Sequence, residues 1–155
     1  MSRFVPPPSD PRMRALLSGY PPTLFSDRFH AACEWLDRYV LEWAVQIATD
    51  LGCARLGGRE VAPEQLCLEL GLLPTFAGPA TWLLRTLAQG GEIRALGAGS
   101  PELFALPAVL RSAEVAPLRR EVLAEHASLS ATLDLLDAAA ALYPGVARGE
   151  KNAET

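Results

Sequence analysis

The stretch VAPEQLCLELGLLPTFAGPATWLLRTLAQGGEIRALGAGSPELFAL, residues 61–106, decides the fold that the sequence predicts. It contains two short helical patterns joined by the turn LLPTFAG. The first helix opens with Pro63 and closes at Gly71, and the second opens with Pro79 and closes before Gly90-Gly91. Proline just inside a helix start and glycine just past its end suit the unpaired backbone groups at the two termini.

A hairpin is expected after the second helix, with strands EIRAL (92–96) and ELFAL (102–106) around the turn GAGSP. Arg59-Glu60-Val61 is expected to add one short strand to it. Four apolar side chains are expected to alternate along the hairpin, namely Ile93, Ala95, Leu103 and Ala105. Three further apolar residues make this alternation imperfect: Leu96, Phe104 and Leu106. The predicted fold class is mainly α, a winged-helix-like helix-turn-helix with a short β-hairpin wing, flanked by two long helical regions.

The first long helical region is predicted for 26–51, with Ser26 as its cap, Asp27 in its first turn and Gly52 after its end. Its apolar residues recur every three or four positions and form one broad stripe. A second face carries the candidate domain-interface residues: Trp35, Tyr39 and Glu42. A helix that is apolar on two sides is expected to pack on two sides. One neighbour is expected to be the winged-helix core, and the second is either another domain or another chain. A long central core helix is the alternative.

The second helical region is predicted for 111–143, with Pro117 in its first turn, and the pattern leaves open whether 113–142 forms one helix or two. Tyr143-Pro144-Gly145 is expected to end it. The predicted domain organisation is a proline-rich leader (1–25), a winged-helix-like domain with a long N-terminal helix (26–110), the C-terminal helical region (111–143) and a linker to a missing downstream domain (144–155).

Composition limits the class of protein. The 155 residues suit one domain, and 14 Lys+Arg against 18 Asp+Glu give a net charge of −4, which provides no long-range attraction to nucleic acid or anionic lipid. No stretch approaches the roughly 20 apolar residues that a membrane span needs. Without an apolar signal core at the N-terminus, a cytoplasmic protein is expected. Its three separated cysteines are expected to be buried thiols: Cys33, Cys53 and Cys67.

No catalytic motif is present. The glycine pairs suit turns, no G-x-G-x-x-G follows a strand, and no serine lies in a nucleophile elbow. His30 and Glu34 are one helical turn apart, but two histidines in distant helices make a poor metal site without more ligands. The sequence therefore predicts no catalytic, cofactor-binding or metal site, and a self-standing enzyme is the weakest hypothesis.

A winged helix suggests DNA binding, but the charges oppose it. Residues 50–110 carry four arginines and six acidic residues, and the second helix holds only Arg85. Neutralising several phosphates dominates affinity for DNA, and this region cannot supply that many positive charges. A winged-helix DNA-binding transcriptional regulator is therefore kept as the alternative function.

Two segments resemble a known family. The run at 50–96 resembles the helical, winged-helix-like region that precedes the catalytic core in many S-adenosylmethionine-dependent methyltransferases, through an L-x-x-x-L-G-L…L-L-R-x-L…G pattern. The run at 135–155 is similar to the linker before the methyltransferase core of modular polyketide synthases, where a Y-P-x-V-x-x-G-E-like stretch recurs. The matching residues here are Tyr143, Pro144, Val146, Gly149 and Glu150.

The resemblance implies a non-catalytic lid or adaptor domain of a polyketide synthase methyltransferase-type region, as in a loading module of antibiotic biosynthesis. The E/D-x-G-x-G-x-G motif of the cofactor core is absent, so S-adenosylmethionine is implied for a downstream domain and no cofactor for this chain. The implied partner is an adjacent catalytic domain of the same polypeptide. An acyl carrier protein and a second copy of the chain are further candidates, whereas nucleic acid and membrane are not expected.

Overall fold

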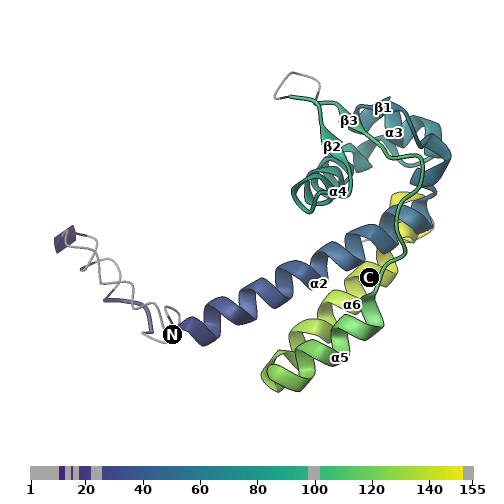
Figure 1. Cartoon of the computed structure of the whole chain (residues 1–155). Helices are drawn as coiled ribbons and strands as arrows, with labels where there is room; N and C mark the ends of the chain where they lie inside the picture. The colour runs from purple at the N-terminus through teal and green to yellow at the C-terminus, as the bar shows by residue number, and fades with distance from the viewer. Residues whose placement is uncertain (1–10, 13–14, 16–17, 22–25, 98–101, 152–155) are drawn as a thin grey trace. The chain divides into compact units, whose positions relative to one another are not determined.

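The computed structural model describes residues 11–12, 15, 18–21, 26–97 and 102–151. The chain divides into two compact units, Met1–Asp37 and Arg38–Thr155, and each is described by itself. Most of the predicted leader (1–25) lies outside the described residues, as do 98–101 of the hairpin turn and 152–155 of the predicted linker. The described elements are mainly helical, with one small antiparallel sheet (Figure 1).

The long helix α2 spans Asp27–Leu51, as the sequence predicts. Ser26 caps it, because its Oγ accepts the N–H of Phe29 at 3.2 Å. Gly52 ends it with a φ of 87°, a left-handed conformation that glycine adopts without strain. The first part of α2 belongs to the first unit and the part from Arg38 onward to the second.

The two short helices are α3 (Pro63–Leu70) and α4 (Ala77–Gln89), separated by the 3₁₀ helix η3 (Pro74–Phe76). Pro63 opens α3, and Gly71 closes it at a φ of 68°, as predicted. The predicted start of the second helix at Pro79 is wrong, since α4 begins two residues earlier. Proline fits any position of a first turn, because the N–H groups there have no acceptor within the helix.

Three two-residue strands form the sheet: β1 (Glu60–Val61), β2 (Arg94–Ala95) and β3 (Phe104–Ala105). Their order is β1-β3-β2 and both pairings are antiparallel, so the predicted third strand is confirmed. The predicted alternation is wrong in both strands. In the first strand Ile93 is buried but Ala95 is exposed, and the second strand differs further. There Phe104 and Leu106 are buried whereas Leu103 is exposed, because β3 turns its even-numbered residues towards the core.

The hydrophobic core of the second unit lies where α2, α3, α4 and the sheet meet. Val45 of α2, Leu66 of α3 and Leu83 of α4 are fully buried in it, and Phe104 of β3 is 1% exposed. Ala140 and Ala147, from the C-terminal helix, join the same cluster. The long helix is therefore a core element of the second unit along its C-terminal part.

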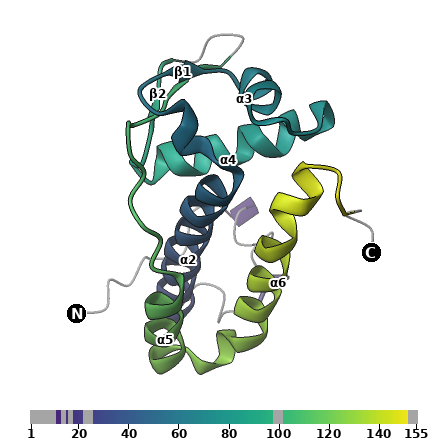
Figure 2. The ribbon, with the colours of Figure 1, turned by 90° about the vertical axis from the view of Figure 1, so that its right-hand side faces the viewer.

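The C-terminal region forms two helices, α5 (Val115–Glu125) and α6 (Ser130–Ala147), joined by the 3₁₀ helix η4 (Ala127–Leu129) (Figure 2). Pro117 lies in the first turn of α5, as predicted. The predicted end at Tyr143-Pro144-Gly145 is wrong, because α6 continues through Pro144 to Ala147. Pro144 lacks an N–H, but contacts of Tyr143 and Ala147 with the α3–α4 region hold the last turn in place.

No helix within the described residues is both long enough and apolar enough to cross a membrane.

Candidate interaction surfaces

Tyr39, predicted to face another domain, is fully buried within the second unit. Its hydroxyl donates to Asp137 Oδ1 on α6, which also accepts Trp43 Nε1–H at 2.9 Å. Arg119 of α5 donates from Nε to the other oxygen of Asp137 at 3.0 Å. Burial and the Asp137 hydrogen bond raise the pKa of Tyr39 to about 12, so its phenol stays protonated and remains a donor.

Glu42, the second predicted interface residue, holds the segment between the hairpin and α5. Its carboxylate accepts two guanidinium N–H groups of Arg111, both at 2.7 Å, and the backbone N–H of Glu114 at 2.7 Å. Arg111 also donates to Glu92, at the end of α4, at 2.8 Å. The hydrogen bonds from Arg111 lower the pKa of Glu42, which keeps it charged at neutral pH.

The structure thus gives Tyr39 and Glu42, two residues predicted for the interface, partners inside the second unit. Trp35 is half-buried and belongs to the first unit. The sequence showed that α2 is apolar on two sides, but a single helix does not reveal that α5 and α6 cover the second side. Contact of these residues with another domain stays a prediction.

The segment that resembles a polyketide synthase linker is anchored on the α3–α4 region. Tyr143 donates its hydroxyl hydrogen to the carbonyl of Pro79 at 2.9 Å, and its ring meets Phe76 edge-on at 5.0 Å between centroids. The carbonyl of Ala147 accepts the N–H of Leu73 at 2.8 Å. Gly149, with a φ of 74°, lies so close to Leu73 that an added Cβ would come within 3.2 Å of it. The two resembling segments are therefore neighbours in space.

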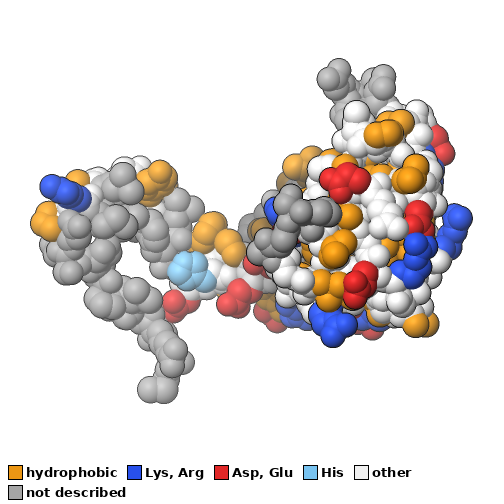
Figure 3. Space-filling view, turned by 90° about the horizontal axis from the view of Figure 1, so that it is seen from above, with side chains coloured by type: hydrophobic (Ala, Val, Ile, Leu, Met, Phe, Trp, Pro, Cys, Tyr) orange, Lys and Arg blue, Asp and Glu red, His pale blue; other side chains and the backbone are white. Residues whose placement is uncertain are grey.

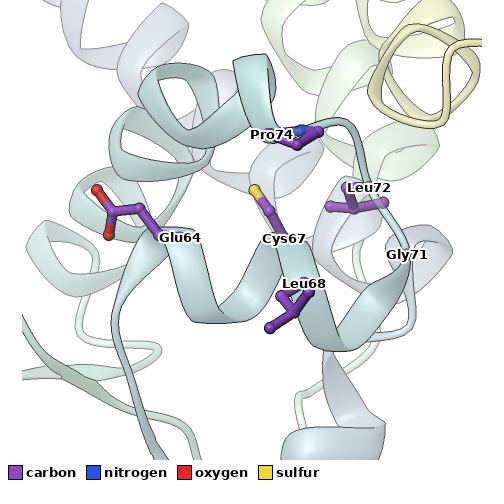
Figure 4. A pocket seen from close by; sticks show the side chains of 6 residues that line it. All are labelled: Glu64, Cys67, Leu68, Gly71, Leu72 and Pro74. Carbon is purple, nitrogen blue, oxygen red and sulfur yellow. The ribbon is translucent and has the colours of Figure 1, made fainter.

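A shallow depression of about 320 Å³ lies along α3 and the turn after it (Figure 4). We call this the α3 surface, and its lining residues are Glu64, Cys67, Leu68, Gly71, Leu72 and Pro74. Leu68 is 81% exposed, and Leu73 beside the depression is 41% exposed. Leu68 therefore contributes little to the core of the second unit.

Two arginines of the helix pair and hairpin region form local ion pairs. Arg59 binds Glu69 through both terminal nitrogens, with Nη2 at 2.7 Å, and Arg85 of α4 binds Glu102 at 3.0 Å. On the face seen in Figure 3, acidic and basic side chains of the second unit are interspersed with hydrophobic ones. Arg85, the one arginine of α4, is thus paired with a carboxylate.

The thiols are suited to packing. Cys53 and Cys67 are buried, as predicted, and Cys33 is half-buried. Burial raises the pKa of Cys53 to about 12 and also raises that of Cys67, so neither forms a thiolate at neutral pH. In the described part of the chain, no group of three or more His, Cys, Asp and Glu residues could hold a metal ion.

No family model matches the chain, and no curated protein matches it. Two solved structures are similar in fold. A crystal structure of the selenomethionine-substituted CurJ carbon methyltransferase gives a TM-score of 0.72 at 20% identity, over 91% of this chain and 36% of that chain. A crystal structure of the DszA carbon methyltransferase gives 0.58 at 23% identity, over 89% of this chain and 32% of that one. The chain spans about a third of the length of each methyltransferase chain.

Proposed function

We propose that this chain is a non-catalytic lid or adaptor domain of a polyketide synthase carbon methyltransferase-type region and packs on its catalytic domain. The observation that carries the proposal is that the similarity covers nearly all of this chain but only about a third of each similar methyltransferase chain. The shared fold takes in 91% of this chain but only 36% of the CurJ carbon methyltransferase chain. The remaining two thirds of such a chain is long enough to form a catalytic domain of its own.

The finer architecture fits a winged-helix-like module. The helices α3 and α4 are followed by the hairpin β2-β3, and β1 pairs with β3. This order supports the interpretation of residues 59–106 as helix-turn-helix and wing. The module rests on α2 and is anchored to α6 through Tyr143, so in our proposal it presents one fixed surface to a catalytic neighbour.

We assign the docking of the catalytic domain to the α3 surface. Leu68 projects from it, while Glu64 adds a charge at its edge. The occupant is the catalytic part that makes up the rest of the similar chains. A domain joined to its partner by a short linker experiences an effective concentration of about 1 mM, so a shallow contact suffices to hold it.

In this proposal S-adenosylmethionine binds to the catalytic domain and not to this chain. The chemistry of methyl transfer likewise belongs to that domain. This chain positions the domain, and the buried, protonated thiols of Cys53 and Cys67 take no part in the reaction.

The test uses the methyltransferase domain encoded in the same polypeptide or in an adjacent gene. Calorimetric titration of that domain with this chain is expected to show binding, and Leu68→Asp is expected to weaken it at least about tenfold, or ~1.4 kcal/mol. Leu135→Asp, on α6, is the matched control and is expected to bind like the wild type. Absence of such a domain, or absence of binding at about 100 µM, contradicts the proposal.

DNA binding is the second candidate only because the order of elements is that of a winged helix. The pairing of Arg59 and Arg85 with carboxylates and a sequence pI of about 5.2 disfavour it. A gel-shift assay at low salt is expected to show no retarded duplex. Salt-sensitive retardation would favour this candidate.

A further inference from the structure

The helix α6 is apolar on two opposite sides. Its inner side packs within the second unit through Leu133, Ala140 and Ala147, which are at most 8% exposed. Its opposite side, which we call the outer face of α6, carries Ala131, Leu135, Ala138, Ala139, Leu142 and Val146. These residues recur every three or four positions, so they form one stripe along the helix.

The outer face is bare in the described structure. Leu135 is 70% exposed and Leu142 is 43% exposed, and none of the six residues of the stripe is charged. A helix at the surface of a monomer carries polar residues on its solvent side, so an apolar stripe there indicates a partner.

We propose that the outer face of α6 binds the same face of a second copy of this chain, with the two helices antiparallel. This inference is independent of the function proposed above. A two-fold symmetric contact must be complementary to itself, because each surface patch meets its own copy. We place the two-fold axis level with the midpoint between Ala138 and Ala139. In this antiparallel pair, each residue lies opposite the residue of the other copy that is equally far from the midpoint on its other side, which we call its mirrored position.

The sequence of the outer face satisfies this symmetry along its whole length. The mirrored position of Leu135 is Leu142, that of Ala138 is Ala139, and that of Ala131 is Val146. Every mirrored pair is therefore apolar on both sides. The alanines at the centre let the two helices approach to about 8 Å, and the leucines on either side of them fill the space between the helices.

The charges beside the outer face are compatible with the pairing. Asp134 borders the stripe, and its mirrored position is Tyr143, so no carboxylate meets a carboxylate. The two copies of Asp134 are about 13 Å apart along the helix axis, from a rise of 1.5 Å per residue. That separation exceeds the Debye length of about 8 Å at physiological ionic strength, so their repulsion is screened. Asp134 also forms an ion pair with Arg119 of its own chain.

The area of the outer face sets the expected affinity of the dimer. The stripe is about 22 Å long and a helix is about 10 Å wide. Its area is below the roughly 800 Å² per partner that a standard stable interface buries. The expected complex is thus a weak dimer, with a dissociation constant of about 10 to 500 µM.

Sedimentation equilibrium of the whole chain from about 5 µM to about 1 mM tests the proposal. The wild type is expected to change from monomer to dimer over this range, whereas Leu135→Asp and Leu142→Asp are expected to remain monomeric and folded by circular dichroism. Leu68→Asp changes a leucine on α3 that is 81% exposed, more than either leucine of the outer face; it is the control and is expected to dimerise like the wild type.

Cross-linking tests the geometry. Ala138→Cys places two thiols beside the two-fold axis, where the Cα atoms fall within the roughly 4.4–6.8 Å that a disulfide allows. Mild oxidation is expected to give a covalent dimer of Ala138→Cys and only traces from Leu68→Cys or the wild type. A wild-type chain that stays monomeric at about 1 mM, or equal cross-linking of Ala138→Cys and Leu68→Cys, overturns the proposal and leaves the outer face to a different partner.

Discussion

The helices α2 and α6 are both apolar on two sides, but the structure covers them differently. From Arg38 to Leu51 only three residues of α2 are exposed, namely Arg38, Thr49 and Asp50. One side packs against α3, α4 and the sheet, and Tyr39 and Trp43 on the other reach Asp137 of α6. Among the described residues of the second unit, none covers Leu135 or Leu142 on the outer face of α6 to a similar extent. Two-sided apolar character thus predicts two partners, but only the structure tells whether both lie within the chain.

The largest expected effect comes from a charge on the covered helix. Val45→Asp places a carboxylate at a position with no exposed surface and no cationic partner. An unpaired buried charge costs more than about 4 kcal/mol, which is most of the stability of a domain this size. We expect the variant to be unfolded by far-UV circular dichroism at 25 °C. A cooperative urea transition near that of the wild type would show that α2 is not a core helix.

Asp137 of α6 links the two helices, and its replacement is expected to have the next largest effect on the free energy of unfolding. Asp137→Ala leaves the buried hydroxyl of Tyr39 and the indole N–H of Trp43 without an acceptor. We expect a loss of about 3 kcal/mol in the free energy of unfolding, measured by urea denaturation. In a double-mutant cycle Tyr39→Phe and Asp137→Ala should couple by about 1 kcal/mol or more. Additive effects would mean that the two side chains do not interact.

Glu42, on the covered helix α2, makes the stability of the chain depend on pH. Its pKa in the folded chain is lowered from the ordinary value of 4.5, chiefly by the hydrogen bonds from Arg111. A lowered pKa contributes stability that is present above the ordinary value and is lost as the pH falls through the folded value. We expect Glu42→Gln to cost about 1 kcal/mol at pH 7, and the difference from the wild type to shrink as the pH falls below the ordinary pKa of 4.5. A difference that stays constant with pH would exclude a charged Glu42 as its cause.

The smallest effect is expected on the uncovered helix face. Leu135 is 70% exposed, so Leu135→Asp removes no core contact from the monomer. We expect its free energy of unfolding to lie within about 0.5 kcal/mol of the wild type at concentrations below about 5 µM. Thermal or urea unfolding at low concentration measures this. A loss of more than about 2 kcal/mol would show that residues of the same chain cover α6.

The local elements could be predicted because their signals are local. The cap at Ser26, the opening of α3 at Pro63 and its end at Gly71 each depend on residues within one turn of the chain. The predicted pairing of residues 59–61 with the hairpin is also confirmed. The end of α6 was mispredicted, because the contacts of Tyr143 with Pro79 and Phe76 outweigh the hydrogen bond that Pro144 cannot make.

The interaction surfaces were harder to predict than the elements. Tyr39 and Glu42 carry the right pattern for an outward-facing patch, but their partners Asp137 and Arg111 are 98 and 69 residues away in sequence. Sequence periodicity measures how apolar a face is and contains no information about which distant segment meets it. The exposed Leu68 and the outer face of α6 became visible only once the covered faces were known.

Local signals in the sequence were enough to predict the cap of α2 at Ser26, the opening of α3 at Pro63 and its end at Gly71. They also predicted the order of helices and strands in residues 61–106 and the local excess of acidic over basic residues. These depend on hydrogen-bonding groups and charges that lie close together along the chain. Only the tertiary structure decided which apolar faces are buried, why the helix runs through Pro144, and which side of α6 is left bare. Burial is a property of pairs of surfaces, and in this chain those pairs are formed by segments far apart in sequence.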